Sequence, residues 1–477
     1  MTAPGGIADL SPVVRRREQR AWYWYDWANS GYVTTVGAVL FAPYLTSVAE
    51  RDACGFTTDV DKGRKCTETL SVIGFSVSPG SLVFYVITLV TILSAFVLPV
   101  VGALADRSPR RRTLMARFAW AGSLAAACMF FVEGTNWPLG AVLLLLGNLG
   151  LGASLVVYDA ILIDIATPDE RDRVSSRGWA LGYLGGGLLL LLNLLLVQGH
   201  DRVGLETTTA VRVSLLSAAV WWAGFTLVPY LGLRDRGPTH AGAGAGAEAG
   251  AEAGRPGRAA TGLVRGSFTQ LRTTLGDLRN YPVTLTFLLA YLFYNDGIQT
   301  VIVSASTYGE NELGFGTSVL ISTILLVQYV AFLGALIFGR AAERLGARRV
   351  VLAGLLLWMV IVSSGYFLPE NEIVPFLVLA SGIGLVMGGT QALSRSFFSQ
   401  LVPRDREAEY FSLYQAGERG TSWLGTLVFG LVHQVTGSYR PAILALIVFF
   451  AVGFVLLLRV DAVRGIREAG NQPPALV

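Results

Sequence analysis

The chain has 477 residues, of which 53% are hydrophobic and only 15% are charged, and its formal net charge is +4. A soluble protein of ordinary composition carries about 25% charged residues, so this chain lacks the charges needed to cover a soluble surface. The composition therefore predicts an integral membrane protein. Its basic residues fall in short clusters between apolar runs, which argues against nucleic acid as a partner.

Twelve apolar runs follow one another along the chain, and each is long enough to cross a bilayer, which takes about 20 mostly apolar residues. Helices are expected because lipid offers backbone groups no hydrogen-bond partners. The predicted fold class is therefore an all-α membrane protein with twelve transmembrane helices. The expected spans are residues 21–46, 81–105, 113–133, 138–166, 176–198, 210–232, 281–308, 317–340, 349–368, 373–400, 410–434 and 438–459.

Arginine clusters assign the two sides of the membrane. Every second loop or terminus holds one of the runs "RRREQR", "RSPRRR", "DERDRVSSR", "RAAERLGARR", "RDRE" and "RVDAVRGIR". The intervening loops "EGTNWP", "GENELGFGTS", "LPENE" and "TGSYR" are poor in arginine. The positive-inside rule then places both termini in the cytoplasm. Because Lys62 and Lys65 are the only lysines, the composition indicates a GC-rich bacterial genome and hence the cell membrane as the location.

Composition also divides the chain into five segments. We expect a cytoplasmic tail, a first half of six helices, a cytoplasmic Gly/Ala-rich linker, a second half of six helices and a second cytoplasmic tail, at residues 1–20, 21–232, 233–280, 281–459 and 460–477. The low-complexity part of the linker, residues 238–262, has no apolar periodicity and is typical of a flexible spacer.

The cysteines and histidines show no metal-binding spacing. Cys54 and Cys66 share the first outer loop, where oxidation is permitted. A disulfide between them and two free thiols are equally expected.

The two halves repeat one motif. "GALADRSPRRR" from Gly102 aligns with "GRAAERLGARR" from Gly339, and in the first and seventh spans Asp26-x-x-Asn29-Ser30 matches Asp296-x-x-Gln299-Thr300. Two six-helix halves built from an internal repeat are typical of transporters, which bind substrate between the halves near the midplane.

The repeated motif is the strongest functional signal. Its glycine lets a neighbouring helix approach closely, and the acid and arginines in the following turn can hold that side of the molecule shut. The run Gly102-x-Leu104-Ala105-Asp106-Arg107-x-x-Arg110-Arg111 resembles the loop motif of the major facilitator superfamily, with Pro109 in place of a glycine. The alternative is that these arginines only flank the membrane-spanning helices on their cytoplasmic side. The candidate gating residues are Gly102, Asp106, Arg107, Arg111, Gly339, Glu343, Arg344 and Arg348.

Three further stretches narrow this resemblance. "YDWANSGY", "LFYNDGIQT" and "QALSRSFFSQLVP" resemble the branch related to vacuolar autophagy amino-acid effluxers and their bacterial permease relatives. The resemblance implies the major facilitator fold, a monomer, helices one, four, seven and ten around a central cavity, and amino acids as cargo.

Polar residues on these four helices are candidates for the cargo or coupling site. Asp296 lies about 15 residues into its span, roughly 22 Å deep, where a carboxylate is costly unless it faces water or a partner. Asp26 lies nearer the cytoplasmic end, so the inner gate is as good a place for it as the cargo site. Arg395 could bind a cargo carboxylate or pair within the gate. The full set is Asp26, Asn29, Asp159, Asn295, Asp296, Gln299, Gln391 and Arg395.

Other residues near these sites have plainer interpretations. Trp22 and Tyr25, with the aromatic residues between them, are expected to form an interfacial belt, although one of them could stack on cargo. Asp164 is expected to form a salt bridge with a loop arginine. Glu418 and Arg419, inside the eleventh span, are expected to pair with neighbouring helices.

The leading hypothesis is a secondary transporter that exports a small polar solute, amino acids first, by alternating access. Proton coupling through Asp296, Asp26 or Asp159 and uniport are both left open, and drug, peptide or sugar-derivative cargo is the alternative. An enzyme would need clustered catalytic or metal-binding residues, so neither an enzyme, a cofactor nor a metal site is expected. A sensor or lipid-handling protein of the same fold is the other class.

Overall fold

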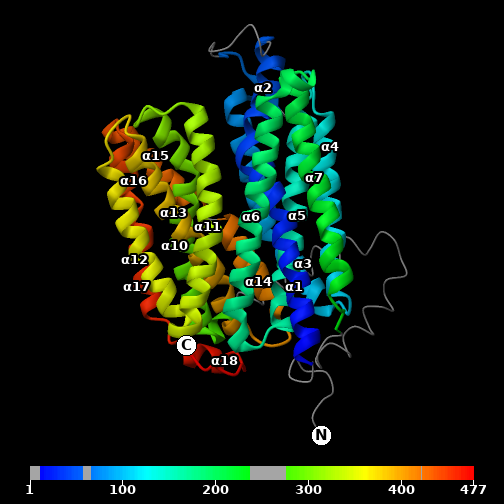
Figure 1. Cartoon of the computed structure of the whole chain (residues 1–477), viewed down its shortest axis with the longest axis vertical. Coiled ribbons are helices and arrows are strands. Elements are labelled where there is room, and N and C mark those ends of the chain that lie inside the picture. The colour runs from blue at the N-terminus through cyan, green and yellow to red at the C-terminus, as the bar shows by residue number, and fades with distance from the viewer. Residues whose placement is uncertain (1–10, 57–65, 73, 237–275, 421, 477) are drawn as a thin grey trace.

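The computed structural model describes residues 11–56, 66–72, 74–236, 276–420 and 422–476, and these residues are mostly helical (Figure 1). The low-complexity segment at 238–262 lies outside the described residues. Proline stands in the first turn of α1, α3, α5 and α10, where its missing N–H costs no hydrogen bond. Ser11 caps α1 by accepting a bond from the Val14 backbone N–H.

The first set of helices ends at Gly232. Its members are α1 (Pro12–Tyr32), α2 (Phe41–Cys54), α3 (Pro79–Arg107), α4 (Arg111–Cys128), α5 (Trp137–Ile165), α6 (Arg171–Gln198) and α7 (Thr207–Gly232). A π-helical stretch, Val33–Leu40, joins α1 to α2 without a break. The first span is therefore longer than predicted at both ends. Its arginine-rich start packs on the end of α5, where the buried Gln19 donates a hydrogen bond to the Ile165 carbonyl at 3.0 Å.

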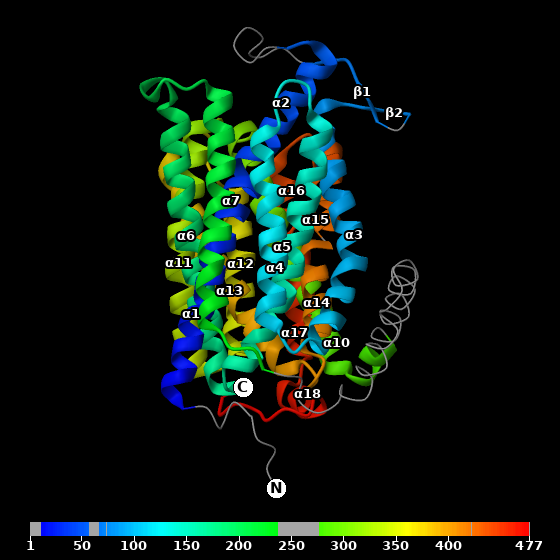
Figure 2. The ribbon, with the colours of Figure 1, turned by 90° about the vertical axis from the view of Figure 1, so that its right-hand side faces the viewer.

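A short hairpin follows α2 and was not predicted. Strand β1 (Leu70–Val72) pairs with β2 (Phe75–Val77) in antiparallel register, with Leu70 opposite Val77. Beside it, a disulfide joins Cys54 to Cys66. Figure 2 shows the hairpin and α2 at one end of the molecule, and α18 with the start of α1 at the other. These ends are called the α2 end and the α18 end below.

The second set of helices begins at Pro282. Its members are α10 (Pro282–Asn311), α11 (Thr317–Leu345), α12 (Ala347–Tyr366), α13 (Ile373–Leu401), α14 (Glu407–Gly420), α15 (Ser422–Thr436), α16 (Tyr439–Ala445) and α17 (Ile447–Leu458), followed by α18 (Ala462–Glu468). Short 3-10 turns link several of these and the earlier helices, at Met129–Phe131, Pro168–Glu170, His200–Val203 and Leu278–Asn280.

Within the described residues, ten helical segments are long and apolar enough to cross a membrane. They correspond to ten of the twelve predicted spans. The other two predictions fall on α10, whose interior carries Asn295 and Asp296, and on α14 and α15, which lie on either side of residue 421. The number twelve therefore stays a prediction.

The helices pack in two groups, shown side by side in Figure 1. Helices α1 to α7 pack mainly on one another and are called the N-terminal group. Helices α10 to α13 and α15 to α17 do the same and, together with α14, are called the C-terminal group, although α14 itself packs mainly on α3 and α5. The groups meet where α6 packs on α11 and α13, and where α3 and α5 pack on α14.

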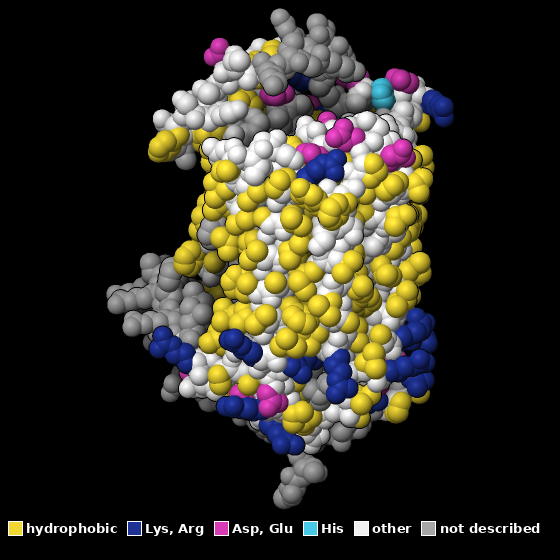
Figure 3. All heavy atoms as spheres, turned by 90° about the vertical axis from the view of Figure 1, so that its left-hand side faces the viewer, with side chains coloured by type: hydrophobic (Ala, Val, Ile, Leu, Met, Phe, Trp, Pro, Cys, Tyr) yellow, Lys and Arg dark blue, Asp and Glu magenta, His cyan; other side chains and the backbone are white. Residues whose placement is uncertain are grey.

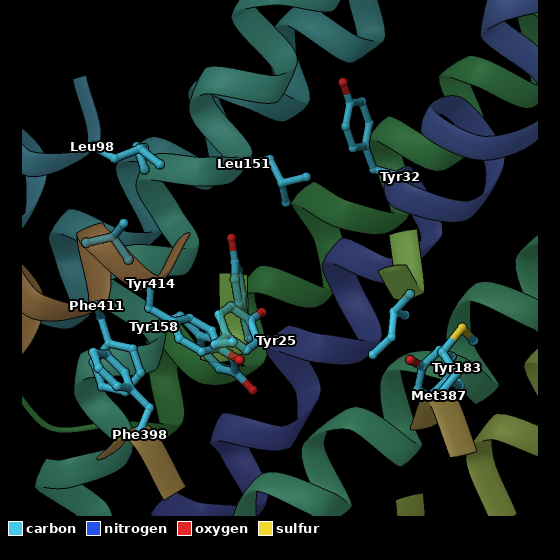
Figure 4. Packing of buried hydrophobic residues seen from close by; sticks show 14 of the residues in the cluster. Tyr25, Tyr32, Leu98, Leu151, Tyr158, Tyr183, Met387, Phe398, Phe411 and Tyr414 are labelled. Carbon is cyan, nitrogen blue, oxygen red and sulfur yellow. The ribbon is translucent and has the colours of Figure 1, made fainter. Parts of the chain in front are cut away.

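The outer surface suits a lipid bilayer. Figure 3 shows a broad belt of hydrophobic side chains between the two ends, with basic side chains gathered below the belt, at the α18 end. Inside, aromatic rings fill much of the core. Figure 4 shows Tyr25 packed on Tyr158, and Phe398 packed on Tyr414.

Candidate functional site

Arg395 of α13 lies at the centre of the contact between the two groups. Its side chain reaches into the N-terminal group and the residue is only 2% exposed. Its Nη2 donates to Asp26 Oδ2 at 2.9 Å and its Nη1 to Asp26 Oδ1 at 3.3 Å, a bidentate pair. Its Nη1 also lies 3.4 Å from Asp159 Oδ1. The sequence predicted these three residues as one candidate set, and the structure brings them together.

Three aromatic rings and a serine complete the surroundings of this guanidinium. The Arg395 Nε donates to Ser175 Oγ at 3.0 Å and its Nη2 to the Ser175 carbonyl at 3.1 Å. The guanidinium carbon lies 4.8 to 5.4 Å from the ring centres of Trp22, Trp179 and Tyr158, within cation–π range. We call the surrounding residues the guanidinium box: Trp22, Asp26, Tyr158, Asp159, Ser175 and Trp179.

Helical spacing assembles the box. Trp22 and Asp26 are four residues apart on α1, and Ser175 and Trp179 are four apart on α6, so each pair shares a helix face. The Trp22 indole donates to the Tyr158 carbonyl at 3.0 Å, which ties α1 to α5. Gly178 is required here, because a Cβ on it would collide with Asp26 Oδ2.

The charged network continues into α14. Gln415 Nε2 donates to Asp159 Oδ2 at 2.8 Å and lies 3.2 Å from Glu418 Oε2. Two carboxylates thus share the guanidinium of Arg395, and an amide links one of them to a third carboxylate. Gln415, Ser175 and Trp179 are not among the site residues predicted from the sequence. Glu418 was expected only to pair with a neighbouring helix, although a charge inside an apolar span was a signal for a site.

Asp296 lies in a different place. It is 1% exposed, and its Oδ2 accepts a hydrogen bond from the Gly425 backbone N–H at 2.9 Å. Its Oδ1, the Thr300 hydroxyl and the side-chain amide oxygen of Asn295 find no hydrogen-bond partner among the described residues. The structure therefore places Asp296 within the C-terminal group. It does not bring Asp296 to Asp26, its counterpart in the sequence repeat.

The remaining candidates of the cargo set form smaller contacts. Asn29 donates to the carbonyl of Tyr25 in its own helix at 2.7 Å. Gln391 accepts a hydrogen bond from the Tyr183 hydroxyl, which crosses between the groups. Asn295 donates to the Glu418 carbonyl at 3.3 Å, and Gln299 is partly exposed.

The first copy of the repeated motif binds the start of α14. Asp106 accepts hydrogen bonds from the backbone N–H groups of Ala408 and Glu409, both at 2.9 Å. A carboxylate at a helix N-terminus satisfies free N–H groups and favours the helix dipole. Gly102 makes this approach possible, because a Cβ on it would lie 2.5 Å from the Ala408 carbonyl oxygen.

Arg111 holds three carboxylates around the same helix start. It lies 2.9 Å from Asp106, 3.1 Å from Glu407 and 3.1 Å from Asp164. A salt bridge of Asp164 with an arginine is thus present as expected, but the partner, Arg111, is the first residue of α4 and not a loop residue. Arg107 is exposed at the end of α3.

The second copy of the motif makes weaker polar contacts. Gly339 packs against Ser176 of α6, where a Cβ would lie 2.6 Å from the Ser176 Cβ. Glu343 approaches Arg173 only to 4.0 Å, and both side chains are more than a third exposed. Arg348 donates to the carbonyls of Leu457 and Leu458 in its own group, and Arg344 is exposed.

Between the box and the α18 end, more hydrogen bonds join the groups. Arg171 donates to the Ser399 carbonyl at 2.8 Å, and Gln400 donates to the Pro168 carbonyl at 2.8 Å. Near the start of α14, the hydrogen bond to Glu409 raises the pKa of Arg406 above its usual range. The two groups are therefore bonded in several layers at this end.

The predicted aromatic belt is wrong for Trp22 and Tyr25. Both are fully buried, at 0% exposure, because α1 lies inside the N-terminal group at their level. Trp24 instead stacks on Phe225 of α7, and Tyr23 is partly exposed. In the described part of the chain, no three His, Cys, Asp or Glu side chains lie close enough to hold a metal ion.

Comparison with known proteins shows which family this chain matches. The family model described as "Vacuole effluxer Atg22 like" matches residues 14–470. The chain is 28% identical to the uncharacterized MFS-type transporter YxiO of Bacillus subtilis, over 92% of this chain and 94% of the relative. It is 25% identical to autophagy-related protein 22-1 of Penicillium rubens, over 98% of this chain and 93% of the relative.

Solved structures show the same fold. The proton:xylose symporter XylE, of the major facilitator superfamily, superposes with a TM-score of 0.68, covering 97% of this chain and 99% of that one at 12% identity. The fucose:proton symporter FucP of E. coli superposes with a TM-score of 0.64, covering 94% and 99% at 13% identity. At such identities the likeness concerns the fold alone.

Proposed function

Because this chain belongs to the Atg22-like vacuole effluxer family and is a major facilitator transporter, we propose that it exports amino acids across the cell membrane. In this proposal the α18 end faces the cytoplasm, as the basic side chains gathered there favour (Figure 3). The family is described as vacuole effluxers, which supports solute transport across a membrane. Release from a vacuole leads into the cytoplasm, so the outward direction is part of the proposal.

The observation that carries the proposal is the charged network between the two groups. It offers a guanidinium, Arg395, and carboxylates, Asp26 and Asp159, within the membrane-spanning helices. An amino acid carries one charge of each sign, so a cargo site needs partners for both. Buried charges inside a membrane are costly and are retained mainly for function.

The same network supports an alternating-access cycle. The contacts that join the groups run from the box to the α18 end, through Arg395, Arg171 and Asp106. We take this arrangement as the state closed toward the cytoplasm. Opening that side requires the groups to separate and these bonds to break together.

Proton coupling is part of the proposal. Asp26 and Asp159 together face one guanidinium, so one negative charge is left without a full partner inside the protein. A proton can neutralise it when the network opens. Asp296, with one carboxylate oxygen free of hydrogen bonds among the described residues, is the second candidate carrier.

The test is uptake of a labelled amino-acid panel into liposomes that hold the purified protein, with and without an imposed pH gradient. Asp296→Asn and Asp159→Asn are compared with the parent, and Asp201→Asn serves as the control because its side chain is 89% exposed. We expect gradient-stimulated uptake in parent and control, and its loss in at least one of the other two variants.

Two results would count against the proposal. No uptake of any amino acid by folded protein would overturn amino acids as cargo and direct the search to peptides, drugs and sugar derivatives. Uptake that ignores the pH gradient in the parent would overturn proton coupling and leave a uniporter.

A further inference from the structure

We propose that the guanidinium box is a cargo subsite for a guanidinium group, and that Arg395 occupies it as a built-in substitute until cargo replaces it. The inference rests on the proposed function and deepens it, since it assigns guanidinium-bearing amino acids as the preferred cargo.

The guanidinium box and Arg395 belong to different helix groups. Its six residues all belong to α1, α5 and α6 of the N-terminal group, whereas Arg395 belongs to α13 of the C-terminal group. When the groups separate at the α18 end, as alternating access requires, Arg395 leaves with α13. The box stays behind as a preformed cavity wall with two carboxylates.

When Arg395 leaves, the two carboxylates of the box lose their counter-charge. Asp26 is 6% exposed and Asp159 is fully buried. Carboxylates left in such a place without a counter-charge are strongly unfavourable. A cationic group of the cargo stabilises them when it takes the place of Arg395 as the groups part, and a proton is the alternative.

The guanidinium box fits a guanidinium better than an ammonium group. The five N–H groups of Arg395 all have acceptors in the box: both oxygens of Asp26, one oxygen of Asp159, and the hydroxyl and carbonyl oxygens of Ser175. A planar guanidinium presents these five donors in a fixed fork, whereas an ammonium has three. The aromatic faces of Trp22, Tyr158 and Trp179 suit a flat cation as well.

A spare polar group lies at the edge of the same box. The Tyr158 hydroxyl is buried and lies near the Asp26 carboxylate without a well-formed hydrogen bond among the described residues. It can donate to another part of a cargo molecule whose guanidinium fills the box.

This arrangement couples binding to opening. Cargo and Arg395 compete for one place, so cargo binds only the state in which Arg395 has withdrawn. A ligand that binds one state alone shifts the population toward it. A guanidinium-bearing cargo therefore opens the α18 end by taking the place of the bond that closes it.

The first experiment measures binding to purified full-length protein by calorimetry, with L-arginine and L-citrulline as a matched pair. Citrulline has almost the same shape as arginine but no charge. We expect arginine to bind at least tenfold tighter, with L-lysine between them. Equal affinity for arginine and citrulline in the parent protein overturns the proposal.

The second experiment empties the box. In Arg395→Gln the competitor is gone, so we expect arginine to bind about tenfold tighter than to the parent and methylguanidinium to raise the midpoint of thermal unfolding. Adding Asp26→Asn to that variant should abolish both effects, whereas adding Asp201→Asn should leave them. If Arg395→Gln does not fold, Arg395→Lys is measured in its place, with arginine again expected to bind tighter than to the parent. Weaker arginine binding in either variant overturns the competition.

Flux separates this inference from the proposed function. Transport of neutral amino acids by a protein that binds arginine no better than citrulline overturns the subsite and keeps the exporter. Arginine-selective binding without flux of any amino acid keeps the subsite and overturns the exporter.

Discussion

Gly102 and Gly339 begin two copies of one motif, yet the acid of the first copy is held far more firmly than that of the second. Asp106 accepts two backbone hydrogen bonds from α14 and pairs with Arg111, while Glu343 approaches Arg173 only to 4.0 Å. Both glycines lie where a helix of the other group comes close. In both copies the glycine thus lets a helix of the other group approach closely. The hydrogen bonds and ion pairs of the acid depend instead on which residues of the other group lie beside it.

The two aspartates of the repeat differ in the same way. Asp26 pairs across the groups with Arg395, whereas Asp296 bonds to the backbone of Gly425 in its own group. A duplicated segment therefore carries different roles once each copy faces a different partner. In the proposed closed state the N-terminal copies join the groups at the α18 end, and four sets of variants test this asymmetry.

The largest effect is expected from Arg395→Ala. It leaves Asp26 and Asp159 buried without their cation, which costs about 3–5 kcal/mol. Thermal unfolding in detergent measures the loss, with Arg349→Ala as the exposed control. Adding Asp26→Asn to Arg395→Ala should recover part of the stability. A single Arg395→Ala variant as stable as the control would show that the network does not hold the groups together.

The next effect compares Asp106→Ala with Glu343→Ala. The first removes a helix cap and a partner of Arg111, at a cost of about 2 kcal/mol. The second removes an exposed and distant ion pair and should cost less than about 0.5 kcal/mol. Unfolding midpoints and initial uptake rates check both. Equal losses in the two variants would mean that the motif copies are equivalent after all.

A smaller effect is expected from Gly102→Ala. Its Cβ would lie 2.5 Å from the Ala408 carbonyl oxygen, so α3 and α14 must move apart, at a cost of about 1–2 kcal/mol. Gly224→Ala on α7 is the control, since a Cβ there meets nothing within 4 Å. That control should be neutral or slightly stabilising. The midpoints of thermal unfolding test this prediction. An unchanged midpoint in Gly102→Ala would show that α3 and α14 accommodate the added methyl group without loss of stability.

Among the buried residues, the smallest effect on stability is expected from Asp296→Asn. The amide oxygen can still accept the bond from the Gly425 N–H, so the change should stay below about 1 kcal/mol. Asp26→Asn, which strips half of the bidentate pair with Arg395, should cost more. Side-by-side unfolding curves test the order. The reverse order would place the important carboxylate in the C-terminal group.

Much of the fold and part of the site could be read from local patterns. Low charge and long apolar runs indicated spanning helices, and the glycine, aspartate and arginine of the first motif copy marked a real contact between groups. Asp26, Asp159 and Arg395 stood out because charges inside apolar spans are rare. Ser175 and Trp179 could not be found this way, since a serine and a tryptophan in a membrane helix are ordinary.

The sequence by itself determined the membrane class, the helical faces and the residues that needed a partner, because helical period and hydrophobicity are local properties. Only the tertiary structure decided which partner each one met. Arg395 and Asp26 are 369 positions apart, and Trp22 and Tyr25 were buried rather than interfacial. Side-chain spacing fixes what a helix offers on each face, but the packing of one helix group on the other fixes which faces meet, and the candidate site exists only where they do.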